Sequence, residues 1–323
     1  MSTLLLHHDV FTEHAPPDGH PERPDRMRAV ERILSHPHFE QLRREEAPMG
    51  TREHALLVHP EDYVHLIEQT SPADGLVALD PDTWMMASSL EAAYRAVGAG
   101  VRAVDAVINL EVNNAFCAVR PPGHHAEQNR AMGFCLFGSV AIAANYARET
   151  YDLDRVAVVD FDVHHGNGTQ DIFWSDEDMF FGSTHQMPLF PGTGAVSETG
   201  QGNIFNAPLS AGDGGDVFRD AMLSRIFPAL DAFEPDLILI SAGFDAHQRD
   251  PLGSLQLTEE DFAWVTLRLM DLADKHCDGR IVSMLEGGYD LAGLSGSVGV
   301  HVKALMHGSG NRAASETEEA LDE

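Results

Sequence analysis

Cysteine is scarce in this sequence, and its scarcity excludes several architectures. Cys117, Cys135 and Cys277 are odd in number, widely spaced and without a Cys-x-x-Cys pair, so neither a disulfide framework nor a thiolate zinc site is indicated. Long apolar runs are missing as well. The opening MSTLLLHHDVF has three leucines in a row, too few for a signal peptide, and no stretch has the length of a membrane span. We therefore expect a protein of the reducing cytoplasm that does not enter a membrane.

Basic residues are also few. The chain of 323 residues has 21 Lys and Arg against 51 Asp and Glu, which gives a formal net charge of −30. A surface of this sign does not follow the phosphates of nucleic acid, so direct nucleic-acid binding is not expected. The acidity serves solubility alone or attracts a cationic substrate.

Hydrophobic residues make up 43% of the chain, which is enough to bury one large core. The 17 prolines and 28 glycines are spread along the sequence, so composition marks no linker or low-complexity block. The last residues, ASETEEALDE, are small and acidic, which is typical of a solvated tail. We predict a single folded domain over residues 1–310 and an acidic C-terminal tail over 311–323.

Short apolar runs of strand type alternate with amphipathic segments of helical length. The spacing predicts strands over 115–119, 155–162, 235–241 and 280–285, and helices over 89–108, 138–151, 216–233 and 258–276. Pro228 is expected to bend or divide the third helix, and Thr258 with Asp261 has the spacing of a capping box. Continuous apolar strands between helices indicate an α/β fold with a parallel sheet covered on both faces.

A polar motif with glycine follows each predicted strand. In chain order these motifs read RPPGHH, DFDVHHGNGT, AGFDAH and EGGYD. Ligands of open parallel sheets bind at the carboxyl ends of the strands, where such loops gather. We therefore expect the four motifs to form one site.

The second motif has the residue types of a metal site. Alternation in an extended segment places Asp160, Asp162 and His164 on one face. Carboxylate and imidazole ligands without a thiolate suit catalytic zinc or iron(II), and Asp245 of the third motif would complete a set of three. A single Asp-x-His is more typical of a turn or a satisfied polar pair, but the other strand-end motifs favour the metal site.

The remaining motifs offer groups that move protons and stabilise charge. His124 and His125 would be natural proton carriers beside a metal-activated water, although an isolated histidine pair is more often a surface feature or a spare ligand. The phenol of Tyr289 could donate to a carbonyl oxygen that becomes an oxyanion, although a lone tyrosine is more often a packed core residue.

Long motifs in a fixed order carry a family resemblance over roughly residues 15–300. They read HPERPDRM, DPDT, RPPGHHAEQNRAMGFC, DFDVHHGNGTQ, FPGTG, SAGFDAHQRDPLG and EGGYDL. The sequence resembles the histone deacetylase and acetylpolyamine amidohydrolase superfamily. Its motifs are most similar to those of class II deacetylases and bacterial histone deacetylase-like amidohydrolases. The resemblance implies an arginase-deacetylase fold, a single α/β domain with a mostly parallel sheet of about eight strands.

The resemblance also implies a reaction. Asp162, His164 and Asp245 would bind Zn²⁺, with Fe²⁺ as an alternative, and metal-activated water would hydrolyse an N-acyl amide. His125 would act as general base and then as general acid. His124, paired with Asp160, would give electrostatic support, and Tyr289 would polarise the acyl carbonyl.

Two departures bear on that reaction. Asn167 stands at the expected partner position of His125, where other members have aspartate, and a neutral amide orients an imidazole without raising its basicity as a carboxylate would. Tyr289 is tyrosine rather than the histidine of the weakly active class IIa enzymes, which argues for true turnover. Gly138 stands where asparagine is expected, and no consequence is assigned to it.

Further positions follow from the same resemblance. Phe134 and Phe190 would form the walls of a tunnel around an acyl-lysine stem, the carbonyl of Gly133 would accept a hydrogen bond from the substrate, and Asp82 would hold substrate backbone at the rim. Structural K⁺ is implied at a site made mainly from main-chain oxygens, with a second such ion near Phe173. The first site would comprise Asp160, Asp162, His164, Ser183 and Thr184.

The leading hypothesis is a zinc-dependent deacetylase that acts on acetyl-lysine peptides or proteins, or on a similar acylated amine. Acetylpolyamine deacetylation is the alternative, which the acidic charge favours. A non-catalytic acyl-lysine binding module and an arginase-like two-metal hydrolase remain as other classes, but the latter needs bridging carboxylates that the sequence does not show. Acyl-chain preference and oligomeric state, including a homo-oligomer, stay open.

Overall fold

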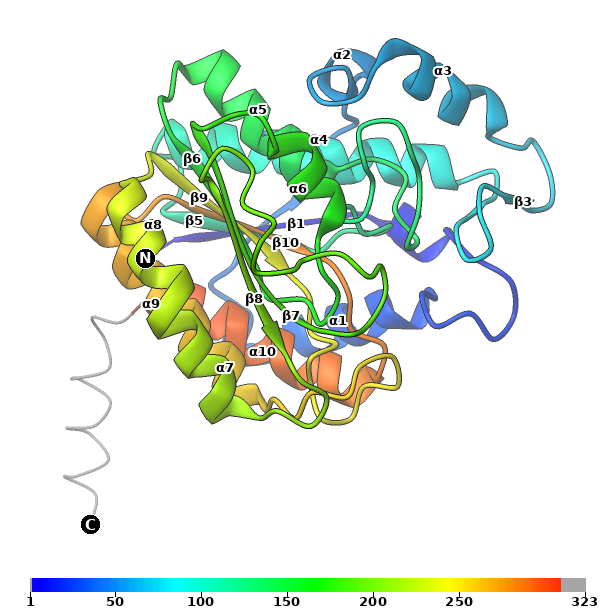
Figure 1. Cartoon of the computed structure of the whole chain (residues 1–323). Coiled ribbons are helices and arrows are strands. Elements are labelled where there is room, and N and C mark those ends of the chain that lie inside the picture. Colours follow the sequence, from blue (N-terminus) through cyan, green and yellow to red (C-terminus); the bar gives the residue numbers. More distant parts are fainter. Residues whose placement is uncertain (1, 309–323) are drawn as a thin grey trace.

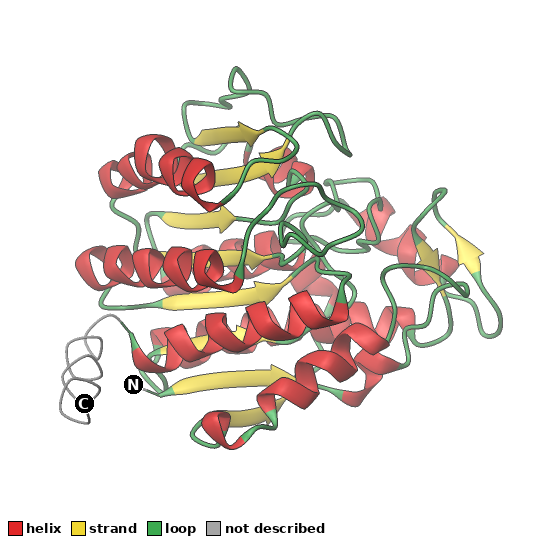
Figure 2. Cartoon of the chain, turned by 90° about the horizontal axis from the view of Figure 1, so that it is seen from below, coloured by secondary structure: helices red, strands yellow, loops and turns green. Residues whose placement is uncertain are grey.

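The computed structural model describes residues 2–308, and its core is one sheet of eight parallel strands in the order β2-β1-β5-β10-β9-β6-β7-β8 (Figures 1 and 2). Every neighbouring pair in this sheet is parallel. The strands are β1 Thr3–His7, β2 Arg43–Glu46, β5 Asn114–Cys117, β6 Val156–Asp160, β7 Met179–Gln186, β8 Ile204–Leu209, β9 Leu237–Ala242 and β10 Ile281–Leu285. Two short strands, β3 Val77–Ala78 and β4 Trp84–Met85, pair apart from it. The predicted α/β fold with about eight strands is confirmed.

Helices cover both faces of the sheet, as Figure 1 shows. α4 packs on α5, and both lie on one face, whereas α10 packs between α1 and α9 on the other. The helices are α1 Asp25–Leu34, α2 Arg52–Ala55, α3 Glu61–Thr70, α4 Ser89–Ile108, α5 Ser139–Tyr151, α6 Asn167–Phe173, α7 Gly215–Ala221, α8 Phe227–Phe233, α9 Glu259–His276 and α10 Leu291–His307.

The central strands are buried along their whole length, because apolar side chains face helices on both sides. β6 (VAVVD), β9 (LILISA) and β10 (IVSML) have no exposed residue. One polar residue among them, Ser283 of β10, meets Nε2 of the buried His301 at 2.8 Å, and Nδ1 of that ring meets the hydroxyl of Thr266 at 2.6 Å. The hydroxyl of Ser283 is therefore satisfied within the core, whereas that of Ser241 on β9 has no partner among the described residues.

The predicted elements agree with the structure to within a few residues. The helix predicted over 89–108 is α4 without change, and α9 begins with the predicted capping box of Thr258 and Asp261. The segment 216–233 is divided, as Pro228 suggested: a π-helical turn over Met222–Ile226 separates α7 from α8, and Pro228 lies in the first turn of α8. The acidic tail predicted over 311–323 and the domain end at 310 lie outside the described residues.

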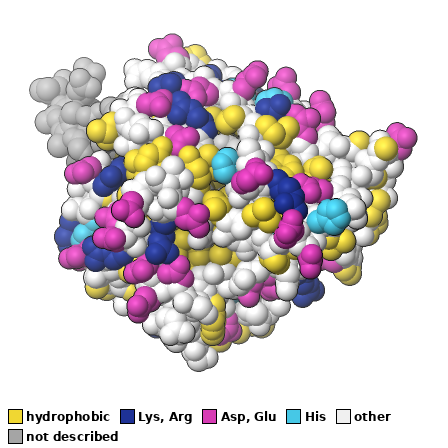
Figure 3. All heavy atoms as spheres, turned by 90° about the horizontal axis from the view of Figure 1, so that it is seen from above, with side chains coloured by type: hydrophobic (Ala, Val, Ile, Leu, Met, Phe, Trp, Pro, Cys, Tyr) yellow, Lys and Arg dark blue, Asp and Glu magenta, His cyan; other side chains and the backbone are white. Residues whose placement is uncertain are grey.

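The surface charges and the helices can be compared with the expectations about nucleic acid and membranes. In the view of Figure 3, acidic, basic and apolar side chains are interspersed on the face that is shown. Within residues 2–308, no helix combines the length and apolar character that crossing a membrane requires.

We expect Gly98→Ala to destabilise the fold, although alanine favours helices by about 1 kcal/mol over glycine. A Cβ at this position of α4 would overlap the carbonyl oxygen of Pro48, where the 48–50 loop crosses the helix. Overpacking against main chain should cost about 1–3 kcal/mol of unfolding free energy in urea titrations. In the control Gly299→Ala, the nearest atom is Ile33 Cγ1 at 3.2 Å, a movable side-chain atom, so its stability should stay within about 1 kcal/mol of the wild type. Equal stability of Gly98→Ala and wild type would contradict the close approach.

Candidate active site

The four strand-end motifs lie next to one another, because β5, β10, β9 and β6 are consecutive in the sheet and parallel. The loop after β5 carries His124 and His125, the loop after β6 carries Asp162 and His164, and the loop after β9 carries Asp245. Tyr289 follows β10. The sheet therefore places the predicted residues at one edge.

Asp162, His164 and Asp245 form a buried cluster whose ligand atoms all lie within 4.8 Å of one another. Nδ1 of His164 is 3.1 Å from Oδ1 of Asp162 and 3.1 Å from Oδ2 of Asp245. Main-chain donors fix both carboxylates: Val163 N–H donates to Asp245 Oδ1 (2.7 Å), and Gly287 N–H donates to Asp162 Oδ2 (2.9 Å). The three side chains are thus held with their ligand atoms directed to one place.

The charges in this cluster fit a cation. Burial, together with the neighbouring Asp162, raises the pKa of the Asp245 carboxyl to about 7. A bound metal would relieve the repulsion between the two carboxylates. Glycines make room for the cluster: a Cβ at Gly243 would overlap the Asp162 carboxylate, and one at Gly287 would overlap Asp245. The donor set suits Zn²⁺ or Fe²⁺, with further positions open for water and substrate.

His124 and His125 stand beside the cluster with different partners and opposite electrostatics. Nδ1 of His124 is 2.8 Å from Asp160 Oδ2, and Nδ1 of His125 is 2.8 Å from Asn167 Oδ1. Burial favours the neutral form of His124, but the carboxylates of Asp160 and Asp162 outweigh it and raise its pKa well above the usual range. Burial and the nearby imidazoles of His124 and His164 hold the pKa of His125 well below its usual range. The surroundings of His124 therefore favour its cationic form, and those of His125 favour its neutral form.

Tyr289 is 9% exposed, and its N–H donates to Asp250 Oδ2 at 2.7 Å. Burial raises the pKa of its phenol well above the ordinary value, although Arg26 opposes the rise. The guanidinium carbon of Arg26 lies 4.8 Å from the centre of the tyrosine ring. The phenol thus keeps its proton and can donate a hydrogen bond.

A buried ion network behind Tyr289 was not predicted from the sequence. Arg26 donates to the carbonyls of Glu286 (2.5 Å) and Gly288 (2.6 Å), and its Nη1 lies 2.9 Å from Glu22 Oε1. Glu22 also accepts from Arg120. Burial raises the pKa of Glu22, but Arg120 and Arg26 outweigh it and hold that pKa well below its usual range. The signal in the sequence was the pair of charges four residues apart in HPERPDRM.

The predicted substrate-binding residues surround these groups. The ring of Phe134 lies 5.9 Å from that of Tyr289, and the ring of Phe190, 40% exposed, lies 5.1 Å from that of His125. Gly133 adopts φ +55°, and a Cβ there would overlap the ring of His125, so only glycine fits. Asp82 reaches this edge through Thr83, whose hydroxyl donates to Asp82 Oδ1 (3.3 Å) and accepts from Phe134 N–H (3.1 Å). The tunnel itself stays a prediction.

The residues expected to hold a monovalent cation are neighbours. Asp160 and Ser183 pair in register between β6 and β7. The hydroxyl of Thr184 is buried without a hydrogen-bond partner among the described residues, as an oxygen near a cation would be. K⁺ at this site remains a prediction. The second expected region differs: the carbonyls of Phe173, Asp176 and Met179 accept from the amide nitrogen of Asn203, at 3.0, 3.0 and 2.7 Å. A second ion near Phe173 also remains a prediction.

Two other residues of the motifs have structural partners. His165 does not join the metal cluster, because its ring bonds the hydroxyl of Thr193 (2.8 Å) and Gln170 Oε1 (3.1 Å). It thereby ties the loop after β6 to the FPGTG loop. Gly138 precedes α5, and its N–H donates to Nε2 of His59 at 3.0 Å.

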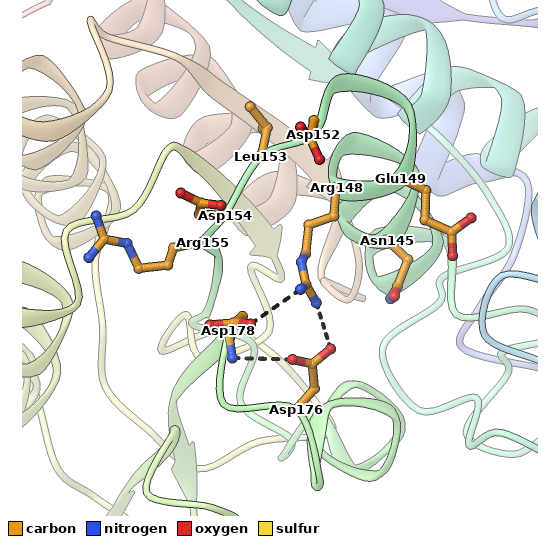
Figure 4. A pocket seen from close by; sticks show the side chains of 9 residues that line it. All are labelled: Asn145, Arg148, Glu149, Asp152, Leu153, Asp154, Arg155, Asp176 and Asp178. Atoms are coloured by element: carbon orange, nitrogen blue, oxygen red, sulfur yellow. Dashed lines mark hydrogen bonds and ion pairs between the residues drawn. The ribbon is translucent and has the colours of Figure 1, made fainter.

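A hollow of about 720 Å³ lies elsewhere on the molecule (Figure 4). Its lining includes residues 152–155, Asp176 and Asp178, which precede β6 and β7, so it is at the amino end of the sheet. Arg148 bridges Asp176 (2.6 Å) and Asp178 (3.4 Å) within it. The metal cluster and the histidine pair are at the opposite edge, so we place the active site there.

Comparisons with known proteins agree on one family. The family model described as histone deacetylase domain matches residues 20–305. A probable deacetylase of Archaeoglobus fulgidus is 38% identical over 100% of this chain and 91% of its own length. A histone deacetylase-like amidohydrolase of Pseudomonas aeruginosa is 39% identical over 85% of this chain and 73% of its own. The crystal structure of the HDA15 HD domain superposes with a TM-score of 0.90 at 34% identity, covering 95% of this chain and 90% of that one.

We expect Asp245→Ala to abolish tight binding of Zn²⁺, because only two ligands remain. The N–H of Val163, which lies between these two ligands in the chain, also loses its acceptor. Metal content after dialysis, measured by mass spectrometry, should fall about tenfold or more. The control Asp290→Asn alters a nearby carboxylate that caps α10 and should keep its metal. Full zinc occupancy in Asp245→Ala would show that the ligand set is wrong.

Proposed function

Since the chain belongs to the histone deacetylase family and is a hydrolase of the deacetylase type, we propose that it removes acetyl or related acyl groups from N-acyl-lysine side chains, or from similar acylated amines, in a zinc-dependent reaction. The observation that carries this proposal is the buried Asp162, His164 and Asp245 cluster beside two histidines, of which His124 is bonded to Asp160 and His125 to Asn167. Acyl transfer to water needs these elements together.

Asp162, His164 and Asp245 would hold the zinc. The ion would supply Lewis-acid polarisation of the acyl carbonyl and would lower the pKa of a water in the site. The protein supplies the proton transfers and the orientation.

His125 is the proposed proton carrier. Its lowered pKa keeps the ring neutral, so one nitrogen can accept the proton of the attacking water while Nδ1 is held by Asn167. The same ring then returns the proton to the leaving amine. His124 stays protonated beside Asp160, and its positive charge stabilises the negative charge that develops on the substrate.

Tyr289 is the proposed oxyanion donor. Its buried phenol keeps its proton and can donate to the acyl oxygen as that oxygen gains charge. Water attacks directly, so the reaction needs no acyl-enzyme.

The class of acylated amine is inferred from the side chains near the catalytic groups and from the net charge. Phe134 and Phe190 offer apolar rings beside the catalytic groups, which suits the methylene stem of an acyl-lysine. The net charge of −30 favours the second candidate, an acetylpolyamine. An arginase-like two-metal site is not supported, because the described residues contain one cluster of three or more side chains that could hold a metal, and it has three ligands.

We also propose a cytoplasmic location and assembly into homo-oligomers. The buried, unpaired state of Cys117, Cys135 and Cys277 supports a reducing compartment. Acetylated peptides, proteins or polyamines are the proposed partners, without direct nucleic-acid binding.

We expect Tyr289→Phe to lower kcat by about 100-fold or more, because the oxyanion loses its donor. Zinc content and the melting temperature should stay close to wild type. The hydrogen bond that Tyr289 makes to Asp250 uses its main-chain N–H, which the substitution keeps. Unchanged turnover would reject the oxyanion role.

Substrate class is tested by measuring kcat/KM for acetyl-lysine peptides and for acetylated putrescine and spermidine with the same enzyme preparation. The lysine-directed proposal predicts a preference for peptides of about tenfold or more, since apolar rings and a rim carboxylate are offered to a longer substrate. A preference of the same size for the polyamines would select the alternative. Activity on none of these substrates, with zinc bound, would favour a binding module.

A further inference from the structure

Glu286 lies where three of the strand-end loops meet. It directly follows β10, which has β5 on one side and β9 on the other. Its N–H donates to the carbonyl of Ala242 at the end of β9 (3.0 Å), and its carbonyl accepts from Arg26 (2.5 Å). The main chain of Glu286 is thus fixed toward β9 and α1, while its side chain reaches the loop after β5.

The carboxyl group of Glu286 accepts two main-chain hydrogen bonds from the loop that carries the histidine pair. Oε2 lies 2.6 Å from the nitrogen of Gly123 and 3.1 Å from that of His124. Glu286 is 1% exposed, and its Oε1 has no hydrogen-bond partner among the described residues. Burying a carboxyl group with one unpartnered oxygen is costly, so the bonds at Oε2 are the compensation that the structure offers.

His124 is anchored at three points, and Glu286 supplies one of them. Its carbonyl accepts from Gly168 N–H at 2.9 Å, and its ring is bonded to Asp160. Its N–H is bonded to Glu286. Without an acceptor at that position, the N–H groups of Gly123 and His124 would be buried and unsatisfied. The segment Gly123–His124, which precedes His125, would then lose its hydrogen bonds to the residue that follows β10.

We propose that Glu286 is a positioning residue, which fixes His124 and His125 relative to the metal ligands through its two bonds at Oε2. The inference rests on the proposed deacetylase function. The two bonds use lone pairs on one oxygen, so an uncharged acceptor of the same length can make them. Reach therefore matters more than charge.

Three substitutions separate reach from charge. Glu286→Gln keeps the reach and removes the charge, Glu286→Asp keeps the charge and shortens the reach, and Glu286→Met keeps the approximate volume without an acceptor. We expect kcat on an acetyl-lysine peptide to stay within about fivefold of wild type for Gln and to fall about 30-fold or more for Asp and Met, since small misplacements of catalytic groups cost up to about 100-fold. KM should change less than about threefold, because no substrate-binding residue is altered.

Asn203→Ala is the matched control for general destabilisation. Asn203 is buried and donates to three carbonyls, but it precedes β8 at the amino edge of the sheet, away from the histidines. It should lose thermal stability while its kcat stays at the wild-type level. If Glu286→Met does not fold, the order of Gln and Asp still decides the question.

A second measurement does not depend on turnover. In ¹⁵N-histidine NMR spectra, the ring signals of His125 should keep their positions in Glu286→Gln and shift or broaden in Glu286→Asp. Full activity and unchanged signals in Asp, or equal losses in Gln and Asp, would overturn the positioning role. A loss of kcat in Asn203→Ala equal to that in Asp would overturn it too. Inactive wild type on every acyl-amine substrate would instead reject the proposed function, and the NMR comparison would still test the positioning of the histidines.

Discussion

Two carboxylates, those of Asp162 and Asp245, are buried against the same imidazole of His164, and this concentration of negative charge governs the surrounding structure. Buried charges of one sign are tolerated only when donors and a cation compensate them. The loops supply the donors as main-chain N–H groups from Val163 and Gly287. The charge that these donors leave uncompensated supports the proposed divalent metal.

In the proposed reaction, the two histidines have different roles because their rings face different neighbours. His124 faces carboxylates and is held cationic, whereas His125 faces imidazoles and the amide of Asn167 and is held neutral. A neutral base and a fixed positive charge at adjacent positions are what water attack on an amide requires. The two rings come from one loop, and the separate anchors at Asp160, Asn167 and Glu286 explain how neighbours in sequence hold different roles.

Much of this site could be predicted because its residues belong to short motifs that can be recognised in the local sequence. Continuous apolar runs mark β6, β9 and β10, and the polar motif after each run marks the same edge of the sheet. Strands β1, β2, β7 and β8 were not predicted; two of them break the pattern, since β2 reads RREE at an exposed sheet edge and β8 contains a proline. Contacts between distant segments leave no local signal. Arg120 and Glu22 are 98 residues apart, and Gly123 and Glu286 are 163 apart, so neither pair was predicted.

The claim that one metal cluster drives hydrolysis is tested most directly by titrating metal-depleted protein with Zn²⁺ while measuring acetyl-lysine hydrolysis and bound zinc together. The structure predicts activity that is absent without metal, rises in proportion to bound zinc and reaches its plateau at one zinc per chain, as a single cluster with three protein ligands requires. Full activity in the metal-depleted protein, or a plateau that needs two zinc ions per chain, would contradict it.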